Sequence, residues 1–174
     1  CSPTLAGLKT GSLFSCPYSS QKMIIKEIRE FNQKLTQKGI RIIPVRISDK
    51  RMLVYVYRPE KLKEDFSDEK TQIILKCKGY DCTNLSQCIC RLIQKLQSDP
   101  DFPHEIGLFL GYPAEDVKGF IENKAACSKC SGCWKVYGDE QAARILFKKY
   151  KKCTEIYCRR WKSGVAVEQL TITI

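Results

Sequence analysis

The alternation of element types after residue 103 is the feature that most constrains the fold of this chain. The residues predict a strand at 104–111 (HEIGLFLG), a helix at 113–124 (PAEDVKGFIENK) and a strand at 134–138 (WKVYG). A long helix at 139–164 and a last strand at 165–174 (VAVEQLTITI) follow. Strands that alternate with helices are usually parallel and joined by right-handed crossovers. The second half is therefore predicted to be a βαβαβ unit.

The first half predicts one β-hairpin among helices. Two runs rich in β-branched and aromatic residues, 40–48 and 51–59, are separated by Asp49 and Lys50, which is typical of a hairpin. Pro44 predicts an edge position or a bulge in its strand. Helices are predicted at 19–39, at a short segment from Pro59, at 67–79 and at 84–96.

Together these elements indicate the fold class. The chain has 174 residues, which is enough for one domain with its own core. We expect a single α/β domain over residues 1–174, in which the hairpin and the βαβαβ half form a mixed sheet of about five strands covered by helices.

The composition argues against a membrane-spanning protein and indicates the cytoplasm as the compartment. Hydrophobic residues make up 43% of the chain, but no run approaches the roughly 18–20 apolar residues that span a bilayer, so no membrane partner is expected. The eleven cysteines are an odd number in a chain too long to need disulfides. We therefore expect reduced thiols and a cytoplasmic protein.

The net charge of +11 favours polyanionic partners in general. The basic residues of the predicted 139–164 helix fall opposite its apolar face, which carries Tyr150, Tyr157 and Trp161. Nucleic-acid-binding surfaces place aromatic residues among the basic ones, so a nucleic-acid partner is disfavoured.

Cys127, Cys130 and Cys133 form two successive C-x-x-C spacings. Two thiolates at this spacing can bind one tetrahedral ion, so the three cysteines could serve as ligands of zinc or of an iron–sulfur cluster. Zinc would take its fourth ligand from Cys153, Cys158 or His104. The alternative interpretation is a flexible loop of reduced thiols.

The remaining candidate residues lie in two segments. His104 is the only histidine, so with Glu105 it is the candidate acid–base pair. In the opening segment, Lys9 could lower the pKa of the Cys1 thiol and make it a nucleophile. Gly7 and Gly11 there, and Gly111 and Tyr112 after His104, are the candidate cofactor-binding residues. Glu115 and Asp116 are interpreted as helix-start residues that compensate the helix dipole.

Four quoted segments resemble one bacterial family. They are CSPTLAGLKTGSLF, KGIRIIPVRISDKRMLVYVYRPEKL, FPHEIGLFLGYPAEDVKGFIENK and WKVYGDEQAARILFKKYKKC, which together extend over nearly the whole chain. The family is known as domain of unknown function 3793. The resemblance implies an intracellular protein, mostly of anaerobic bacteria, and implies no particular activity, cofactor or catalytic residue.

Three functions follow from these observations. The leading hypothesis is a domain that binds a small molecule or cofactor through the opening segment and the HEIGLFLGYP segment, with thiol chemistry at Cys1. The second is a metal-binding or redox protein built on Cys127, Cys130 and Cys133. The third is a polyanion-binding module. The sequence selects no reaction and no oligomeric state.

Overall fold

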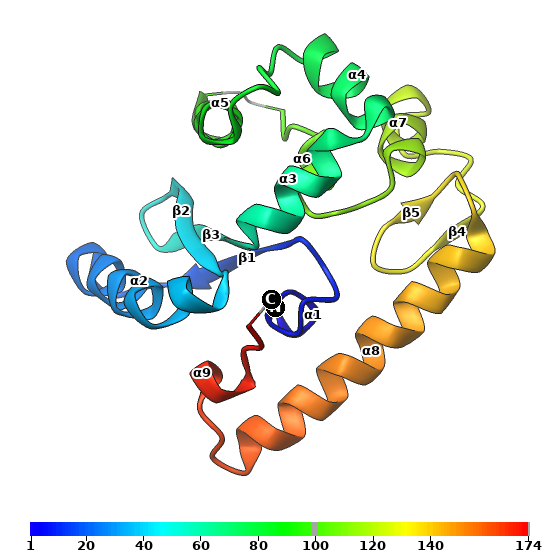
Figure 1. Cartoon of the computed structure of the whole chain (residues 1–174). Coiled ribbons are helices and arrows are strands. Elements are labelled where there is room, and N and C mark those ends of the chain that lie inside the picture. The colour runs from blue at the N-terminus through cyan, green and yellow to red at the C-terminus, as the bar shows by residue number, and fades with distance from the viewer. Residues whose placement is uncertain (99–100, 174) are drawn as a thin grey trace. The chain divides into compact units, whose positions relative to one another are not determined.

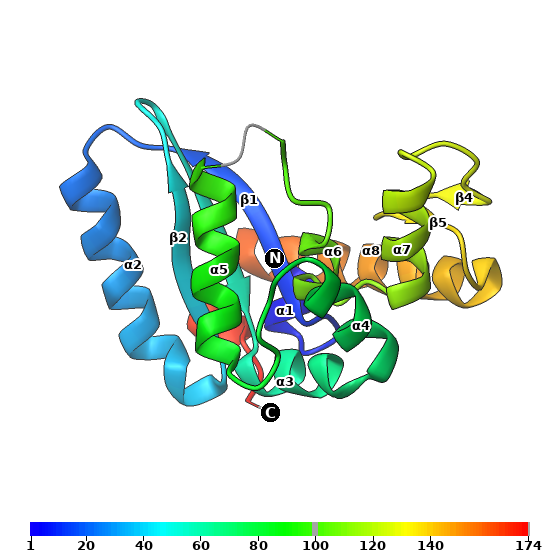
Figure 2. The ribbon, with the colours of Figure 1, turned by 90° about the horizontal axis from the view of Figure 1, so that it is seen from above.

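The computed structural model describes residues 1–98 and 101–173. The chain forms two compact units (Figures 1 and 2). The first comprises Cys1–Lys61 and Cys153–Ile174, and the second comprises Leu62–Lys152. Each unit is described by itself below.

The first unit is built on a three-stranded antiparallel sheet. Its strands β1 (Gly11–Pro17), β2 (Arg41–Ile47) and β3 (Arg51–Tyr57) have the order β1-β3-β2. Helix α2 (Gln21–Leu35), followed by the 3-10 turn η1 (Thr36–Lys38), lies along the sheet (Figure 2). Their shared core contains Ile28, Leu35, Ile40, Met52, Val54 and Val56. Burial of these apolar side chains is the main stabilising contribution to this unit.

A buried arginine joins distant segments of the first unit. The side chain of Arg58, 2% exposed, donates hydrogen bonds to the carbonyl oxygens of Thr4 (2.8 Å), Leu5 (2.8 Å), Lys38 (3.0 Å) and Ile172 (2.8 Å). Burial lowers the pKa of this guanidinium below its ordinary value, against the opposite effect of Tyr157. Its charge is thus balanced by backbone dipoles, which fixes helix α1 (Ser2–Leu5) and the segment after helix α9 (Val167–Leu170).

The second unit is mainly helical. It contains most of α3 (Pro59–Ser67), then α4 (Glu69–Cys77), α5 (Leu85–Ser98), α6 (Ile106–Phe109), α7 (Ala114–Glu122) and the start of α8 (Glu140–Lys162). Strands β4 (Cys130–Ser131) and β5 (Lys135–Val136) form a short antiparallel pair. In the core, the Phe109 ring contacts Phe66 edge-on at 5.0 Å and Tyr80 at 5.5 Å between centroids.

The α/β character and most helices are confirmed, including the 19–39 helix and its left-handed Gly39. The hairpin is also confirmed, with β2 at the sheet edge and a register shift between Pro44 and Arg46. No helix in residues 1–98 or 101–173 is both long and apolar enough to cross a membrane.

The predicted βαβαβ half and the sheet of about five strands are wrong. Residues 104–111 contain helix α6, and the 165–173 segment contains helix α9 in place of a strand. The run HEIGLFLG has no β-branched residue except Ile106, and short apolar runs fit helix and strand equally. Tertiary contacts influence the conformation of the 165–173 segment, because the Lys38 ammonium donates to the carbonyl oxygens of Glu168 and Thr171.

Strand β1 is an element that the sequence did not predict. Its residues, GSLFSCP, are mostly small or polar. They pair with β3 along the whole strand, from Gly11 opposite Tyr57 to Pro17 opposite Arg51. Long-range pairing with a strongly β-forming partner therefore overrides a weak local preference.

Candidate functional site

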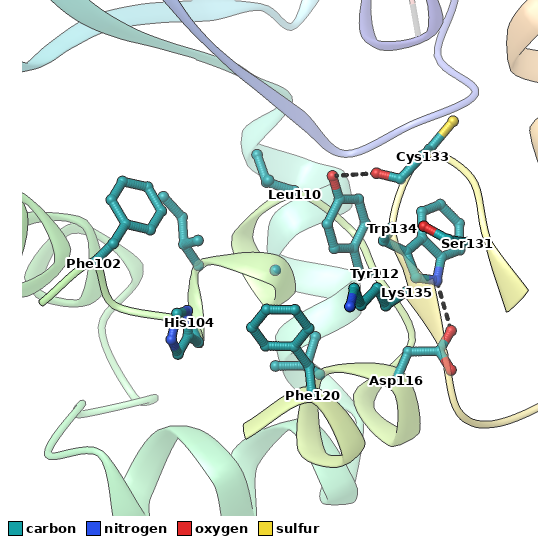
Figure 3. Close-up of a pocket in the computed structure, with 13 residues that line it drawn as sticks. Phe102, His104, Leu110, Tyr112, Asp116, Phe120, Ser131, Cys133, Trp134 and Lys135 are labelled. Carbon is teal, nitrogen blue, oxygen red and sulfur yellow. Dashed lines mark hydrogen bonds between the residues drawn. The ribbon is translucent and has the colours of Figure 1, made fainter. Parts of the chain in front are cut away.

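The second unit contains a hollow of about 370 Å³ between α6, α7 and the β4–β5 pair (Figure 3). We call it the aromatic hollow, because the rings of Phe102, His104, Tyr112, Phe120 and Trp134 line it. Figure 3 shows Phe102 and His104 on one side of this group and Tyr112 and Trp134 on the other, with Phe120 between them. Aliphatic side chains and few polar groups complete the lining.

Two pairs of rings form its walls. Tyr112 and Trp134 are stacked, with ring centroids 4.7 Å apart and planes 26° apart. His104 and Phe120 meet edge-on at 5.0 Å and 69°. The Tyr112 hydroxyl donates to the carbonyl oxygen of Cys133 at 3.4 Å, and burial raises the pKa of this tyrosine. Both geometries are among those that aromatic pairs favour.

Asp116 fixes the Trp134 wall. This carboxylate, 2% exposed, lies in the first turn of α7 and accepts three hydrogen bonds of 2.7 Å. The Trp134 indole N–H donates to Oδ2, and the backbone N–H groups of Tyr137 and Gly138 donate to Oδ1. A buried carboxylate with three donors is a strong link, here between α7 and the β4–β5 pair.

Gly107 allows the helices around the aromatic hollow to approach closely. A Cβ atom at this position would lie 2.7 Å from Cγ2 of Val117 and 3.1 Å from Cδ2 of Tyr112. Real Cβ contacts are longer, so any other residue would displace one of these two lining side chains.

Glu105, beside His104, is buried in an ion pair. Its Oε1 lies 2.7 Å from Nζ of Lys95 and accepts a hydrogen bond of 3.1 Å from the Tyr80 hydroxyl. Burial acts to raise the pKa of Glu105, but the hydrogen bond from Lys95 and further interactions outweigh it, and the pKa is lowered. The same burial, with the adjacent carboxylate, raises the pKa of Tyr80. Glu105 therefore remains ionised and bonded to Lys95.

The comparisons with known proteins give one match. A family model described as "Protein of unknown function (DUF3793)" matches residues 1–171. The chain belongs to this family. No curated protein and no solved structure matches the chain. The matched range includes every residue that lines the aromatic hollow of this DUF3793 protein.

The four candidate catalytic residues divide between the two units of the DUF3793 chain. Cys1 and Lys9 lie in one compact turn of the first unit, where Thr4 N–H donates to Cys1 O at 2.9 Å and Lys9 N–H to Pro3 O at 3.2 Å. His104 and Glu105 lie in the second unit. His104 lines the aromatic hollow, and His104 and Glu105 both line a neighbouring one.

The candidate cofactor-binding residues divide in the same way. Gly7 adopts a left-handed conformation (φ 69°) just after α1, and Gly11 begins β1 opposite Tyr57. Both serve the turn and strand of the first unit. In the second unit, Gly111 is also left-handed (φ 75°) and directs the chain to Tyr112, which lines the aromatic hollow.

The three candidate metal ligands lie around the β4–β5 pair. Cys127 is exposed and left-handed (φ 57°), Cys130 begins β4, and Cys133 lies in the turn before β5. Within the described ranges 1–98 and 101–173, no three cysteine, histidine or acidic side chains come close enough to hold a metal ion. Cys133 instead lines the aromatic hollow.

Sequence reasoning missed most of the residues that build this site. Phe102, Phe120 and Trp134 were not singled out, and Asp116 was interpreted only as a helix-start residue. Asp116 does lie in the first turn of α7. However, the three hydrogen bonds that it accepts come from residues 18 to 22 positions further along the chain. The single available signal was the number of aromatic residues between 102 and 134.

Proposed function

We propose that this protein binds a small, planar, mainly apolar molecule in the aromatic hollow. The observation that carries the proposal is the convergence of five rings on one hollow of about 370 Å³. Ligand sites typically have volumes of roughly 300–1,000 Å³, apolar or aromatic walls and a few polar groups. The hollow has these properties, and a planar molecule would gain stacking contacts with its rings.

His104 offers a polar group that can orient such a ligand. The His104 imidazole makes no hydrogen bond with the residues that the structure describes, and its ring packs on Phe120. By contrast, Asp116 is occupied by three donors, and the Lys135 ammonium donates to the carbonyl oxygen of Ala125. An imidazole can donate or accept, so it suits a heteroaromatic ring with a polar edge.

Ligand-observed NMR with indole, quinoline and adenine tests the proposal, with cyclohexanol as the non-planar control. The site variant is Phe102→Ala, since Phe102 lines the hollow but is 45% exposed and its truncation should leave the fold intact. The matched control is Phe14→Ala, because Phe14 is 40% exposed and lies on β1.

We expect at least one planar probe to bind the wild type and Phe14→Ala equally. One ring contact contributes about 1 kcal/mol to the binding free energy, so Phe102→Ala should weaken binding by about fivefold. Absence of binding by all three planar probes at millimolar concentration contradicts the proposal. Equal weakening by both substitutions would also contradict it.

A further inference from the structure

A second hollow of the same unit adjoins the aromatic hollow. It has a volume of about 700 Å³, and Phe102, His104 and Phe120 line both hollows. Tyr112 and Trp134 line only the aromatic hollow, and Figure 3 shows them at the opposite end from Phe102 and His104. The two hollows therefore meet at the end formed by Phe102 and His104, so a ring held in the aromatic hollow can extend a substituent into the second one.

The second hollow is lined by Lys78, Lys95 and Lys124, and we call it the lysine hollow. These lysines come from three elements, since Lys78 follows α4, Lys95 lies on α5 and Lys124 follows α7. Among the residues that the structure describes, the acidic groups in this lining are Asp101 and Glu105. Three ammonium groups and two carboxylates leave one positive charge uncompensated.

Lys95 is already paired and forms part of the wall. Its Nζ lies 2.7 Å from Oε1 of Glu105, and the two side chains are only 14% and 5% exposed. The Lys95 ammonium also donates to the carbonyl oxygen of Lys78 at 2.8 Å. A buried ion pair with further hydrogen bonds is costly to break, so this lysine is not expected to exchange its partner for a ligand.

Lys78 and Lys124 carry the charges that remain for a ligand. Both residues are exposed, and in the part of the chain that the structure describes neither ammonium has an ion pair or a hydrogen bond. Their backbones are nevertheless fixed. The Lys78 N–H donates to the carbonyl oxygen of Leu75 at 3.0 Å, and Lys124 is left-handed (φ 47°) in a turn that the Ala126 N–H closes on the carbonyl oxygen of Asn123 at 2.8 Å.

We propose that the ligand is an aromatic carboxylic acid, with its ring in the aromatic hollow and its carboxylate in the lysine hollow, attracted by Lys78 and Lys124. The inference rests on the proposed binding of a planar molecule in the aromatic hollow. One carboxylate matches the single uncompensated charge of the lining, whereas a phosphate monoester would bring a charge of about −1.5 to −2. His104, which lines both hollows, can donate a hydrogen bond to the same carboxylate.

Ligand-observed NMR with indole-3-propionate and indole-3-propionamide tests the inference, with indole as the ring alone. The acid and the amide share the ring and the chain and differ in charge. An ion pair between exposed groups is worth up to about fivefold in affinity, so at low ionic strength we expect the acid to bind about fivefold more tightly than the amide. Added salt should weaken binding of the acid and leave binding of the amide unchanged.

The double variant Lys78→Gln/Lys124→Gln tests where this preference arises. Glutamine removes the charge, so the acid and the amide should bind this variant with about equal affinity, and the amide should bind it as it binds the wild type. The matched control is Lys148→Gln/Lys149→Gln, which removes the same charge from exposed positions on α8 that line neither hollow. This control should keep the preference for the acid.

The outcomes distinguish this inference from the proposed function. If indole and the amide bind the wild type and the acid binds no more tightly than the amide, the inference is overturned and the proposed function stands. A preference that persists in Lys78→Gln/Lys124→Gln, or that disappears equally in Lys148→Gln/Lys149→Gln, also overturns the inference. If no indole probe binds at millimolar concentration, the inference fails, and the proposed function fails with it when quinoline and adenine do not bind either.

Discussion

Replacing Asp116 with asparagine should break the hydrogen bond that links Trp134 to α7. The new amide oxygen can still accept from the two backbone N–H groups that reach Oδ1, but the amide nitrogen then faces the Trp134 N–H, and two donors oppose each other. A hydrogen bond to a charged group contributes about 1.5–3 kcal/mol, and the two remaining bonds lose their charge assistance. We expect the free energy of unfolding to fall by about 2–4 kcal/mol.

A double-mutant cycle with Trp134→Phe isolates this bond. Trp134→Phe removes the indole donor, so Asp116→Asn should cost about 2 kcal/mol less in that background than in the wild type. Urea denaturation followed by far-ultraviolet circular dichroism gives the four free energies without relying on tryptophan emission. A coupling energy below about 0.5 kcal/mol would refute the role given to the Asp116–Trp134 bond.

Three further predictions concern stability. Arg58→Met should lower the free energy of unfolding by about 3–5 kcal/mol in urea denaturation, because it removes the guanidinium that donates to four carbonyl groups, one in a buried and three in part-buried hydrogen bonds. Gly107→Ala should cost about 1–3 kcal/mol and weaken probe binding in the NMR assay, since the added Cβ meets Val117. The pKa of Glu105 is lowered in the folded protein, so its contribution should be complete above its unfolded pKa of about 4.3 and disappear as the pH falls through the lower folded value. Thermal unfolding from pH 7 to pH 3 should therefore show a cost for Glu105→Gln that shrinks at low pH; a constant cost would contradict this.

Local patterns predicted the elements whose own residues determine them. The α2 segment has a clear apolar face and ends at Gly39, whose φ of 73° few other residues adopt readily. Pro44 indicated a bulge because proline cannot donate to the ladder. The unpredicted strand β1 and the wrongly predicted strand at 165–174 depend instead on residues far away in the chain, which no local pattern contains.

The site was harder to predict for the same reason. Two of the candidate residues after position 103, His104 and Tyr112, do line the aromatic hollow. The Asp116–Trp134 hydrogen bond joins the start of a predicted helix to a predicted strand. The sequence of neither segment indicates that the two side chains meet. Helical periodicity also placed Trp161 on the apolar face of the last long helix, yet this side chain is 64% exposed.

The hydrogen bonds of Arg58 have a consequence for how the protein is made. One of its acceptors, Ile172, lies 114 positions further along the chain, and the whole second unit is inserted between the two parts of the first. A ribosome therefore finishes the second unit before it supplies the residues that complete the first. Residues 1–61 therefore cannot complete their unit until residues 153–173 have been made, so a chain that ends at residue 152 should have its second unit folded and the remainder of its first unit open to proteolysis.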